Sequence, residues 1–115
     1  MTTPADTVSR AAEAPASLRT LVERFDHDAF DLPGERAVIR LATEGEPAWD
    51  VEIDRFGARL EKKRSGDPDA LLTADPPTWD GIAEDVASGM AAFRRGRLRV
   101  RRNLHLGVGF LAATS

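Results

Sequence analysis

Residues 49–54 read WDVEID, in which three apolar side chains alternate with three carboxylates. This period of two is typical of a strand with one buried side and one solvent-facing side. The next residues, DRFG at 54–57, permit a tight hairpin turn. Phe56, Ala58 and Leu60 then occupy alternate positions and predict the apolar side of the strand after the turn. We therefore expect an antiparallel hairpin in the middle of the chain.

Before the hairpin, the sequence predicts one more strand and, ahead of it, a helix. Ala37, Ile39 and Leu41 occupy alternate positions and indicate a strand. The apolar residues of 18–25 recur at i, i+3, i+4 and i+7, which predicts one stripe of a short helix. Ser17 is placed to cap the first turn of that helix. The chain thus runs from a helix into a meander of three strands.

The segments after the hairpin show strand and helix patterns in turn. Asp75 and Pro76 suit the cap and the first position of a helix, and Asn103 suits the cap of the last one. The expected elements are a strand at 70–74, a helix from 76 to 89, a helical turn at 90–93, a strand at 97–101 and a helix at 104–113. The predicted class is α+β, with a single five-stranded, mostly antiparallel sheet covered by helices.

The composition is that of one soluble globular domain. The chain has 115 residues, of which 42% are apolar and 30% are charged, and a chain of this length buries roughly two thirds of its unfolded surface. Residues 1–16 lack an apolar period and predict a mobile tail, so the domain is expected at 17–115. The absence of cysteine excludes disulfides, thiolate catalysis and cysteine-based metal sites. Without the pattern of a secretory signal, we expect a cytoplasmic location.

The residue types that most enzymes use are scarce. There are two histidines and no tyrosine or cysteine, whereas general acid and base catalysis needs titratable groups held in a pocket. His27 lies in the sequence DHD, but successive helical residues point about 100° apart, so these three cannot converge on one metal ion. His105 is accompanied by no catalytic signature, and GVG at 107–109 is half of a dinucleotide motif. We expect no catalytic residue, no metal and no cofactor.

Charge is distributed unevenly along the chain. The formal net charge is −3, yet residues 94–102 contain six arginines and all 19 acidic residues precede them. Arg97, Arg99 and Arg101 occupy alternate positions, so they are expected on the outward side of the last strand. One interpretation is a solvated surface balanced by the carboxylates of 49–54; the other is a docking surface for an anionic partner. Nucleic acid is disfavoured, because no aromatic residue interleaves the arginines.

Aromatic and aliphatic residues from every predicted element fall on the inward sides, Trp49, Trp79 and Phe110 among them. From periodicity alone, such a set describes an ordinary hydrophobic core. A ligand cavity is lined by the same residue types. The pattern by itself therefore favours a core without excluding a binding site.

From residue 69 onward the chain resembles the sterol carrier protein 2 family, also called SCP2. The resemblance rests on DALLTAD at 69–75, the aromatic Trp79, GMAAFRRGRLRV at 89–100 and NLHLGVGFL at 103–111. The part before residue 69 matches the family in layout more than in residues. The resemblance implies a five-stranded sheet covered by helices that together enclose an apolar tunnel.

The resemblance also implies a function, which is non-catalytic binding of a sterol, fatty acid, acyl-CoA or similar lipid in that tunnel. Twelve residues at matching positions would line it: Trp49, Ile53, Phe56, Leu60, Leu72, Trp79, Ile82, Val86, Met90, Phe93, Leu98 and Val100. Four more would belong to the covering last helix: Leu104, Val108, Phe110 and Leu111. The hydrophobic ligand is thus the first expected partner.

Two roles follow from the resemblance and the residues. In the first, the domain is a lipid carrier, or a module that presents a lipid to a fused or separate enzyme, and touches membranes transiently. Related domains occur fused to enzymes in bacteria, and this chain ends at Ser115 without the peroxisomal address SKL, so we expect a bacterial module of a larger polypeptide. In the second, the core is filled and the arginine surface anchors the domain to a protein, an anionic membrane or nucleic acid.

Overall fold

The computed structural model describes residues 13–115. Most of the expected mobile tail, 1–16, lies outside the described residues. Within them, Ala14 belongs to the core and is 4% exposed. Helix α2 (Ala16–Glu23) begins after Pro15, whose side chain makes no capping hydrogen bond, and Ser17, expected as the cap, is buried inside the first turn. The folded part of the chain therefore reaches back at least to Ala14.

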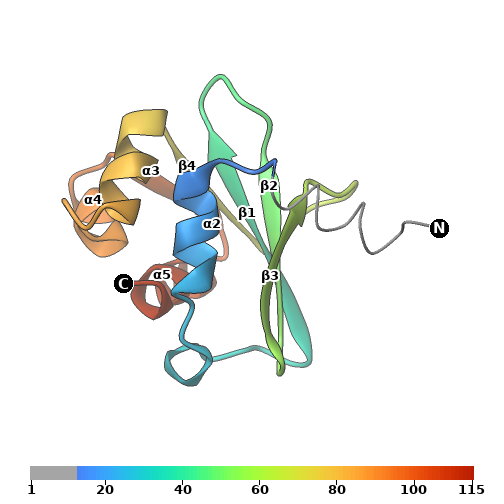
Figure 1. The fold of residues 1–115 in the computed structure, drawn as a ribbon. Helices are drawn as coiled ribbons and strands as arrows, with labels where there is room; N and C mark the ends of the chain where they lie inside the picture. Colours follow the sequence, from blue (N-terminus) through green and yellow to red (C-terminus); the bar gives the residue numbers. More distant parts are fainter. Residues whose placement is uncertain (1–12) are drawn as a thin grey trace.

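A five-stranded sheet forms the centre of the fold (Figure 1). Its strands are β1 (Arg36–Thr43), β2 (Trp49–Asp54), β3 (Gly57–Lys62), β4 (Ala70–Ala74) and β5 (Leu98–Arg102). Their order is β3-β2-β1-β4-β5; β1 and β4 run parallel, and the other neighbours run antiparallel. The predicted α+β class with a mostly antiparallel sheet is confirmed. The order also places β5 at the sheet edge opposite β3.

The turn between β2 and β3 differs from the prediction at one residue. Asp54 accepts a hydrogen bond from the backbone N–H of Phe56 at 2.8 Å. Gly57 has a φ of 136°, a conformation that favours glycine. Since β3 begins only at Gly57, the Phe56 side chain projects from the turn and is 81% exposed, and its expected inward position is wrong. Ala58 and Leu60 do pack against the core.

The helices of the described residues lie on one side of the sheet (Figure 1). Besides α2 they are the short 3₁₀ helix η1 (His27–Ala29), α3 (Pro76–Ala83), α4 (Gly89–Arg94) and α5 (Leu104–Ala113). Oxygens of Asp75, Ser88 and Asn103 cap α3, α4 and α5, each accepting a hydrogen bond from the N–H three residues later at 2.9 to 3.0 Å. Among residues 13–115, no helix combines the length and hydropathy needed to cross a membrane.

Helix α3 ends earlier than predicted. Its last residue is Ala83, and the N–H of Val86 then returns to the carbonyl of Gly81 at 2.9 Å. Asp85 in this turn has a φ of 61°, and Arg24 of α2 donates to carbonyls at the end of α3. Val86 consequently lies outside the helix and is 78% exposed, so its expected inward position is also wrong.

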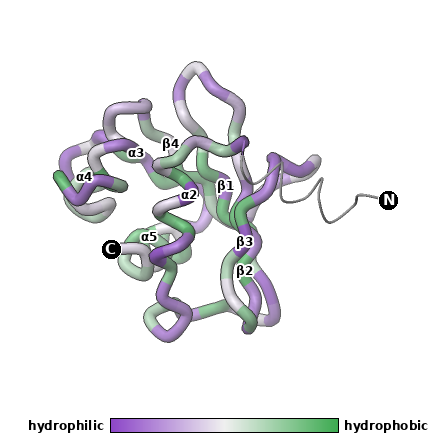
Figure 2. Tube along the Cα trace, viewed as in Figure 1, coloured by the Kyte–Doolittle hydropathy of each residue, from purple (hydrophilic) through white to green (hydrophobic). Residues whose placement is uncertain are grey.

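The core lies between the helices and the inner side of the sheet. In Figure 2 hydrophobic stretches follow the strands and α5, whereas the connecting loops are mainly hydrophilic. Phe25 packs edge-on against Phe30 and stacks on Phe110 of α5, with ring centroids 5.3 and 6.1 Å apart. A Cβ at Gly107 would lie 2.4 Å from Cγ1 of Val100. The absence of a side chain there lets α5 approach the sheet closely.

Candidate functional site

The apolar interior between sheet and helices is the candidate site, and most of its predicted lining lies inside. Eight of the sixteen predicted residues are at most 6% exposed: Trp49, Ile53, Leu72, Trp79, Ile82, Leu98, Phe110 and Leu111. Five more are half-buried: Leu60, Met90, Phe93, Val100 and Val108. The eight buried residues belong to one hydrophobic cluster. Whether any of them contacts a ligand stays a prediction.

Leu104 joins Phe56 and Val86 as a predicted lining residue that does not lie inside. It is the first residue of α5 and is 55% exposed. Leu106 and Phe110 are buried on the helix side that faces the sheet. Seven residues make almost two full helical turns, so Leu104 lies on the same side of α5 as Leu111, which is 1% exposed. Its exposure therefore comes from its place in the first turn of the helix.

The interior contains residues that the sequence prediction did not assign to the site. Leu18 and Leu21 of α2 are at most 1% exposed, and Phe30 after η1 is 8% exposed. Leu18 and Leu21 were visible as a helical stripe, without a signal that this stripe faces the same cluster as Trp79. Phe30 had no periodic neighbours in the sequence, and its place is defined by the aromatic contact with Phe25.

A hollow of about 430 Å³ opens beside Trp49 at the rim of the interior. It is lined by Glu13, Pro47, Ala48, Trp49, Lys62 and Lys63. Trp49 is only 6% exposed and belongs to the buried cluster, so one wall of the hollow is part of the core. Lys62 lies 3.5 Å from the carboxylate of Glu13. The hollow therefore combines an apolar wall with a charged rim of two lysines and one glutamate.

Two further hollows have a different character. One, of about 630 Å³, lies beside the β2–β3 turn and is lined largely by charged residues such as Glu52 and Arg36. The other, of about 570 Å³, lies where β5 meets α5, beside Arg102 and Asn103. Neither is lined by the buried apolar cluster, so the Trp49 hollow is the better match to a lipid site.

The outer side of the sheet carries a buried ion pair. The Asp50 carboxylate is 0% exposed and accepts hydrogen bonds from Nε of Arg40 at 2.8 Å and from the backbone N–H of Arg64 at 2.9 Å. Arg40 also donates to the carbonyls of Arg64 and Gly66 at 3.1 Å. The hydrogen bond with Asp50 raises the pKa of Arg40. The pair therefore holds residues 63–69, the loop between β3 and β4, against the outer side of the sheet.

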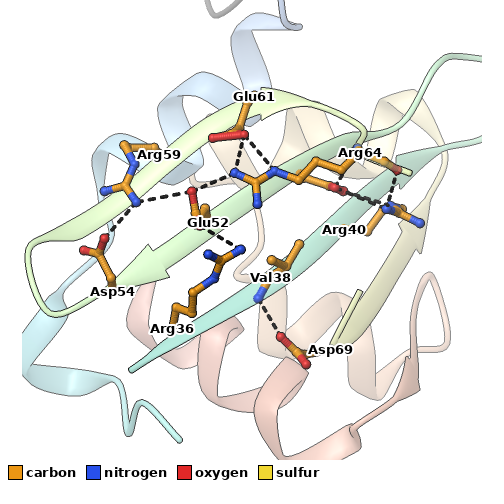
Figure 3. A network of polar contacts seen from close by, with 10 residues as sticks. Arg36, Val38, Arg40, Glu52, Asp54, Arg59, Glu61, Arg64 and Asp69 are labelled. Carbon is orange, nitrogen blue, oxygen red and sulfur yellow. Dashed lines mark hydrogen bonds and ion pairs between the residues drawn. The ribbon is translucent and has the colours of Figure 1, made fainter. Parts of the chain in front are cut away.

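A second group of charges continues this network over β2 and β3 (Figure 3). Arg64 donates to Glu52 and to Glu61, both at 2.7 Å, and Arg59 donates to Asp54 at 2.8 Å. The hydrogen bond from Arg64 is the main reason that the pKa of Glu52 lies below its ordinary value. Charges on this half of the sheet are thus neutralised by one another.

The network predicts that stability falls in acid. Because the pKa of Glu52 is lowered in the folded protein, its contribution is present above the unfolded pKa and is lost as the pH falls through the folded pKa. We expect Glu52→Gln to cost about 1 kcal/mol at pH 6, and this difference should shrink steadily as the pH falls below about 4.3, the pKa of an unperturbed glutamate. Urea unfolding of both proteins from pH 6 to pH 3 measures it. A difference that stays constant with pH would contradict this role of Glu52.

The arginines of 94–102 do not pair with the carboxylates of β2, contrary to one of the two interpretations. β1 and β4 lie between β2 and β5, so the two strands are too far apart for cross-strand pairs. Arg97, Arg99 and Arg101 are exposed, as the alternation predicted. Their charge is therefore not balanced by residues 49–54.

The two histidines lie apart from the interior. His27 is exposed and its Nε2 lies 3.0 Å from the carbonyl oxygen of Asp54. His105 is exposed on α5, which also contains the GVG sequence at 107–109. In the described part of the chain, no group of three or more His, Asp or Glu side chains is placed to hold a metal ion.

Comparison with known proteins identifies the family to which this chain belongs. A family model described as the SCP-2 sterol transfer family matches residues 11–112. The fold is similar to part of the sec-alkylsulfatase Pisa1 from Pseudomonas sp., with a TM-score of 0.61, 16% identity, and coverage of 83% of this chain and 15% of that chain. This chain thus spans about a seventh of the sulfatase. A comparison with curated protein sequences gave no match.

Two smaller proteins share the fold over most of their length. The UbiJ-SCP2 ubiquinone synthesis protein has a TM-score of 0.56 and 17% identity, with coverage of 97% of this chain and 90% of that one. Palmitated SCP2L2 from Aedes aegypti has a TM-score of 0.58 and 16% identity, with coverage of 83% and 91%. At sequence identities this low, the similarity shows a shared fold and nothing more.

Proposed function

Because the chain belongs to the SCP-2 sterol transfer family, whose model matches residues 11–112, we propose that it binds a sterol, fatty acid, acyl-CoA or similar lipid in its apolar interior. In this proposal the domain carries the lipid or presents it to an enzyme, and does no chemistry on it. The observation that carries the proposal is the hollow whose wall is formed by Trp49, a member of the buried cluster.

The proposed route for the lipid runs from this hollow into the space between α2 and β3. These two elements contact one another, and Val22 of α2 and Leu60 of β3 are partly exposed apolar side chains that pack against the core, so an acyl chain entering here would meet an apolar path. Burial of apolar surface is favourable by about 25 cal/mol per Å². The 430 Å³ hollow falls within the range of about 300 to 1,000 Å³ that small-molecule sites occupy.

The rim of the hollow supports an amphipathic ligand. Lys62 and Lys63 lie beside the apolar wall. Because Lys62 is paired with Glu13, the ammonium group of Lys63 is the one that would pair with a carboxylate or phosphate at the polar end of a lipid. A lipid with such an end could keep it in water while its chain lies against Trp49. We therefore expect fatty acids and acyl-CoA to bind more tightly than a neutral sterol.

The structural neighbours support a role beside an enzyme. The fold occurs as about 15% of the chain of an alkylsulfatase and makes up most of a ubiquinone synthesis protein. In the sulfatase, a domain of this fold is part of the enzyme chain itself, where it would hold a poorly soluble molecule near the catalytic unit. We propose the same substrate-presenting role here, with the enzyme fused to this domain or separate from it.

The test is a lipid titration followed by tryptophan emission. We expect a saturable shift with a long-chain fatty acid, retained in Trp79→Phe and lost in Trp49→Phe, because Trp49 lines the hollow whereas Trp79 is 2% exposed and bonded through Nε1 to the carbonyl of Ala42 at 3.2 Å. Native mass spectrometry of the purified protein should show the mass of one bound lipid.

Two results would count against the proposal. A flat titration with sterols, fatty acids and acyl-CoA would remove the lipid-binding function. A shift that persists in Trp49→Phe and disappears in Trp79→Phe would move the ligand away from the hollow. Circular dichroism of both variants serves as the control that each is folded.

A further inference from the structure

Five exposed arginines between residues 94 and 101 lie along and just before β5, the edge strand of the sheet. Arg94 ends α4, Arg95 and Arg97 lie in the turn that follows, and Arg99 and Arg101 point outward from β5. We call these five residues the arginine edge. All five are exposed. Because β5 is the last strand of the sheet, no further strand of the described residues covers them.

The arginine edge differs from the other arginines of the sheet in its lack of partners. Within 13–115, none of its five side chains makes an ion pair or a hydrogen bond, whereas neighbouring Arg102 donates to the carbonyl of Pro68 at 2.8 Å. On the other half of the sheet, Arg55 lies over the ring of Phe56, and four arginines pair with a carboxylate: Arg36, Arg40, Arg59 and Arg64. The positive charge that remains for an external partner is therefore concentrated at this edge.

Two apolar side chains, one half-buried and one exposed, lie near the C-terminal end of β5. Arg101 is paired in register with Leu71 of β4, which is half-buried on the outer side of the sheet. Leu104, at the start of α5, is 55% exposed two residues after the end of β5. Arginine guanidinium groups beside exposed apolar side chains suit an interface that offers phosphates and, just below them, hydrocarbon.

We propose that the arginine edge docks the domain on membranes that contain anionic phospholipids. Each basic residue near such a surface contributes a favourable electrostatic interaction with the headgroups. Nucleic acid fits less well, because proteins that bind single strands stack bases on aromatic rings and the exposed aromatic side chain of the described residues, Phe56, lies on the β2–β3 turn at the other edge of the sheet. The proposal goes beyond lipid binding in the interior and does not depend on it.

The test measures partition of the full chain onto phosphatidylcholine vesicles with and without 30% phosphatidylglycerol. We expect binding that needs phosphatidylglycerol and weakens steeply between 50 and 300 mM salt. Arg99→Gln/Arg101→Gln should lower the partition coefficient about 30-fold, a factor of about 5 for each charge. Neither side chain makes a contact that holds the fold together, so the variant is expected to remain folded.

The matched control is Arg19→Gln/Arg55→Gln, which removes the same net charge from two exposed arginines outside the arginine edge that also make no ion pair within 13–115. We expect less than a 3-fold loss for it. Equal losses in the two double variants would reduce the effect to net charge and overturn the proposal. Wild-type protein that ignores phosphatidylglycerol, or that prefers a DNA duplex to vesicles at equal salt, would overturn it too.

A further outcome concerns the sheet edge itself. Charged side chains on an edge strand also prevent strands of two molecules from pairing. If Arg99→Gln/Arg101→Gln self-associates in size-exclusion chromatography while its vesicle binding is unchanged, edge protection replaces docking as the explanation. The fatty-acid titration is run on the same variants and is expected to be unchanged, so a failure of docking is distinguishable from a failure of lipid binding.

Discussion

Asp50→Ala is expected to lower the free energy of unfolding by about 3 to 5 kcal/mol. The Asp50 carboxylate is fully buried and accepts hydrogen bonds from Nε of Arg40 and from the N–H of Arg64. Without it, Arg40, itself 9% exposed, stays as a buried cation beside carbonyl oxygens alone. The free energy of unfolding of a small domain is about 5 to 15 kcal/mol, so this loss would be a large fraction of the total stability. Urea unfolding followed by circular dichroism measures it.

Two comparisons separate the buried pair from surface charge. Glu61→Ala removes a carboxylate that also pairs with an arginine but is 33% exposed, and we expect it to cost less than about 1 kcal/mol. The double variant Arg40→Met/Asp50→Leu leaves no unpaired buried charge and should recover most of the loss. Equal costs for Asp50→Ala and Glu61→Ala would show that burial of the pair does not govern this region.

Patterns that act over a few residues were sufficient to predict the individual elements. The alternation at 49–54 predicted β2 with its bounds, and the cap at Asn103 with the apolar run after it predicted α5. Caps and alternation work because the hydrogen bonds and side-chain directions that they describe are local. The family resemblance from residue 69 onward, confirmed by the family model, then implied that helices cover a five-stranded sheet, without giving the order of its strands.

The predicted inward positions were wrong where an apolar pattern continued across a turn of the chain. Phe56 keeps the alternation of the hairpin, yet it belongs to the turn that Asp54 closes. Val86 keeps the helical spacing, yet α3 ends at Ala83. In both places a backbone conformation with positive φ, at Gly57 and Asp85, redirects the chain, and apolar periodicity carries no information about φ.

The sequence also did not reveal which strands lie side by side, or which charged residues the strand order brings together. The carboxylates of β2 were one candidate set of partners for the arginines of β5, because both strands alternate in the same way. The parallel pairing of β1 with β4 separates them, and Arg40 and Arg64, from other segments, take the carboxylates instead. The Trp49 hollow likewise joins residues near 13, 48 and 62, which no local pattern connects.

Gly107→Ala is expected to lower the free energy of unfolding by about 1 to 3 kcal/mol, although alanine is favoured over glycine in a helix by about 1 kcal/mol. A Cβ at this position would lie 2.4 Å from Cγ1 of Val100 and 3.3 Å from Cδ1 of Leu72. Val100 is β-branched and has little freedom to rotate away, so α5 must move off the sheet. Thermal or urea unfolding measures the loss.

The sign of this effect is tested inside the same helix. A Cβ at Gly109 would have Cε1 of Phe30 as its nearest neighbour, at 4.0 Å, so Gly109→Ala should raise stability by up to about 1 kcal/mol. Adding Val100→Ala to Gly107→Ala removes the clashing methyl groups and should restore part of the loss. Opposite signs at two glycines of one helix can arise only from what each one faces, since their helix propensities are the same. If both alanine variants are stabilised, α5 does not rest on β5 through Gly107.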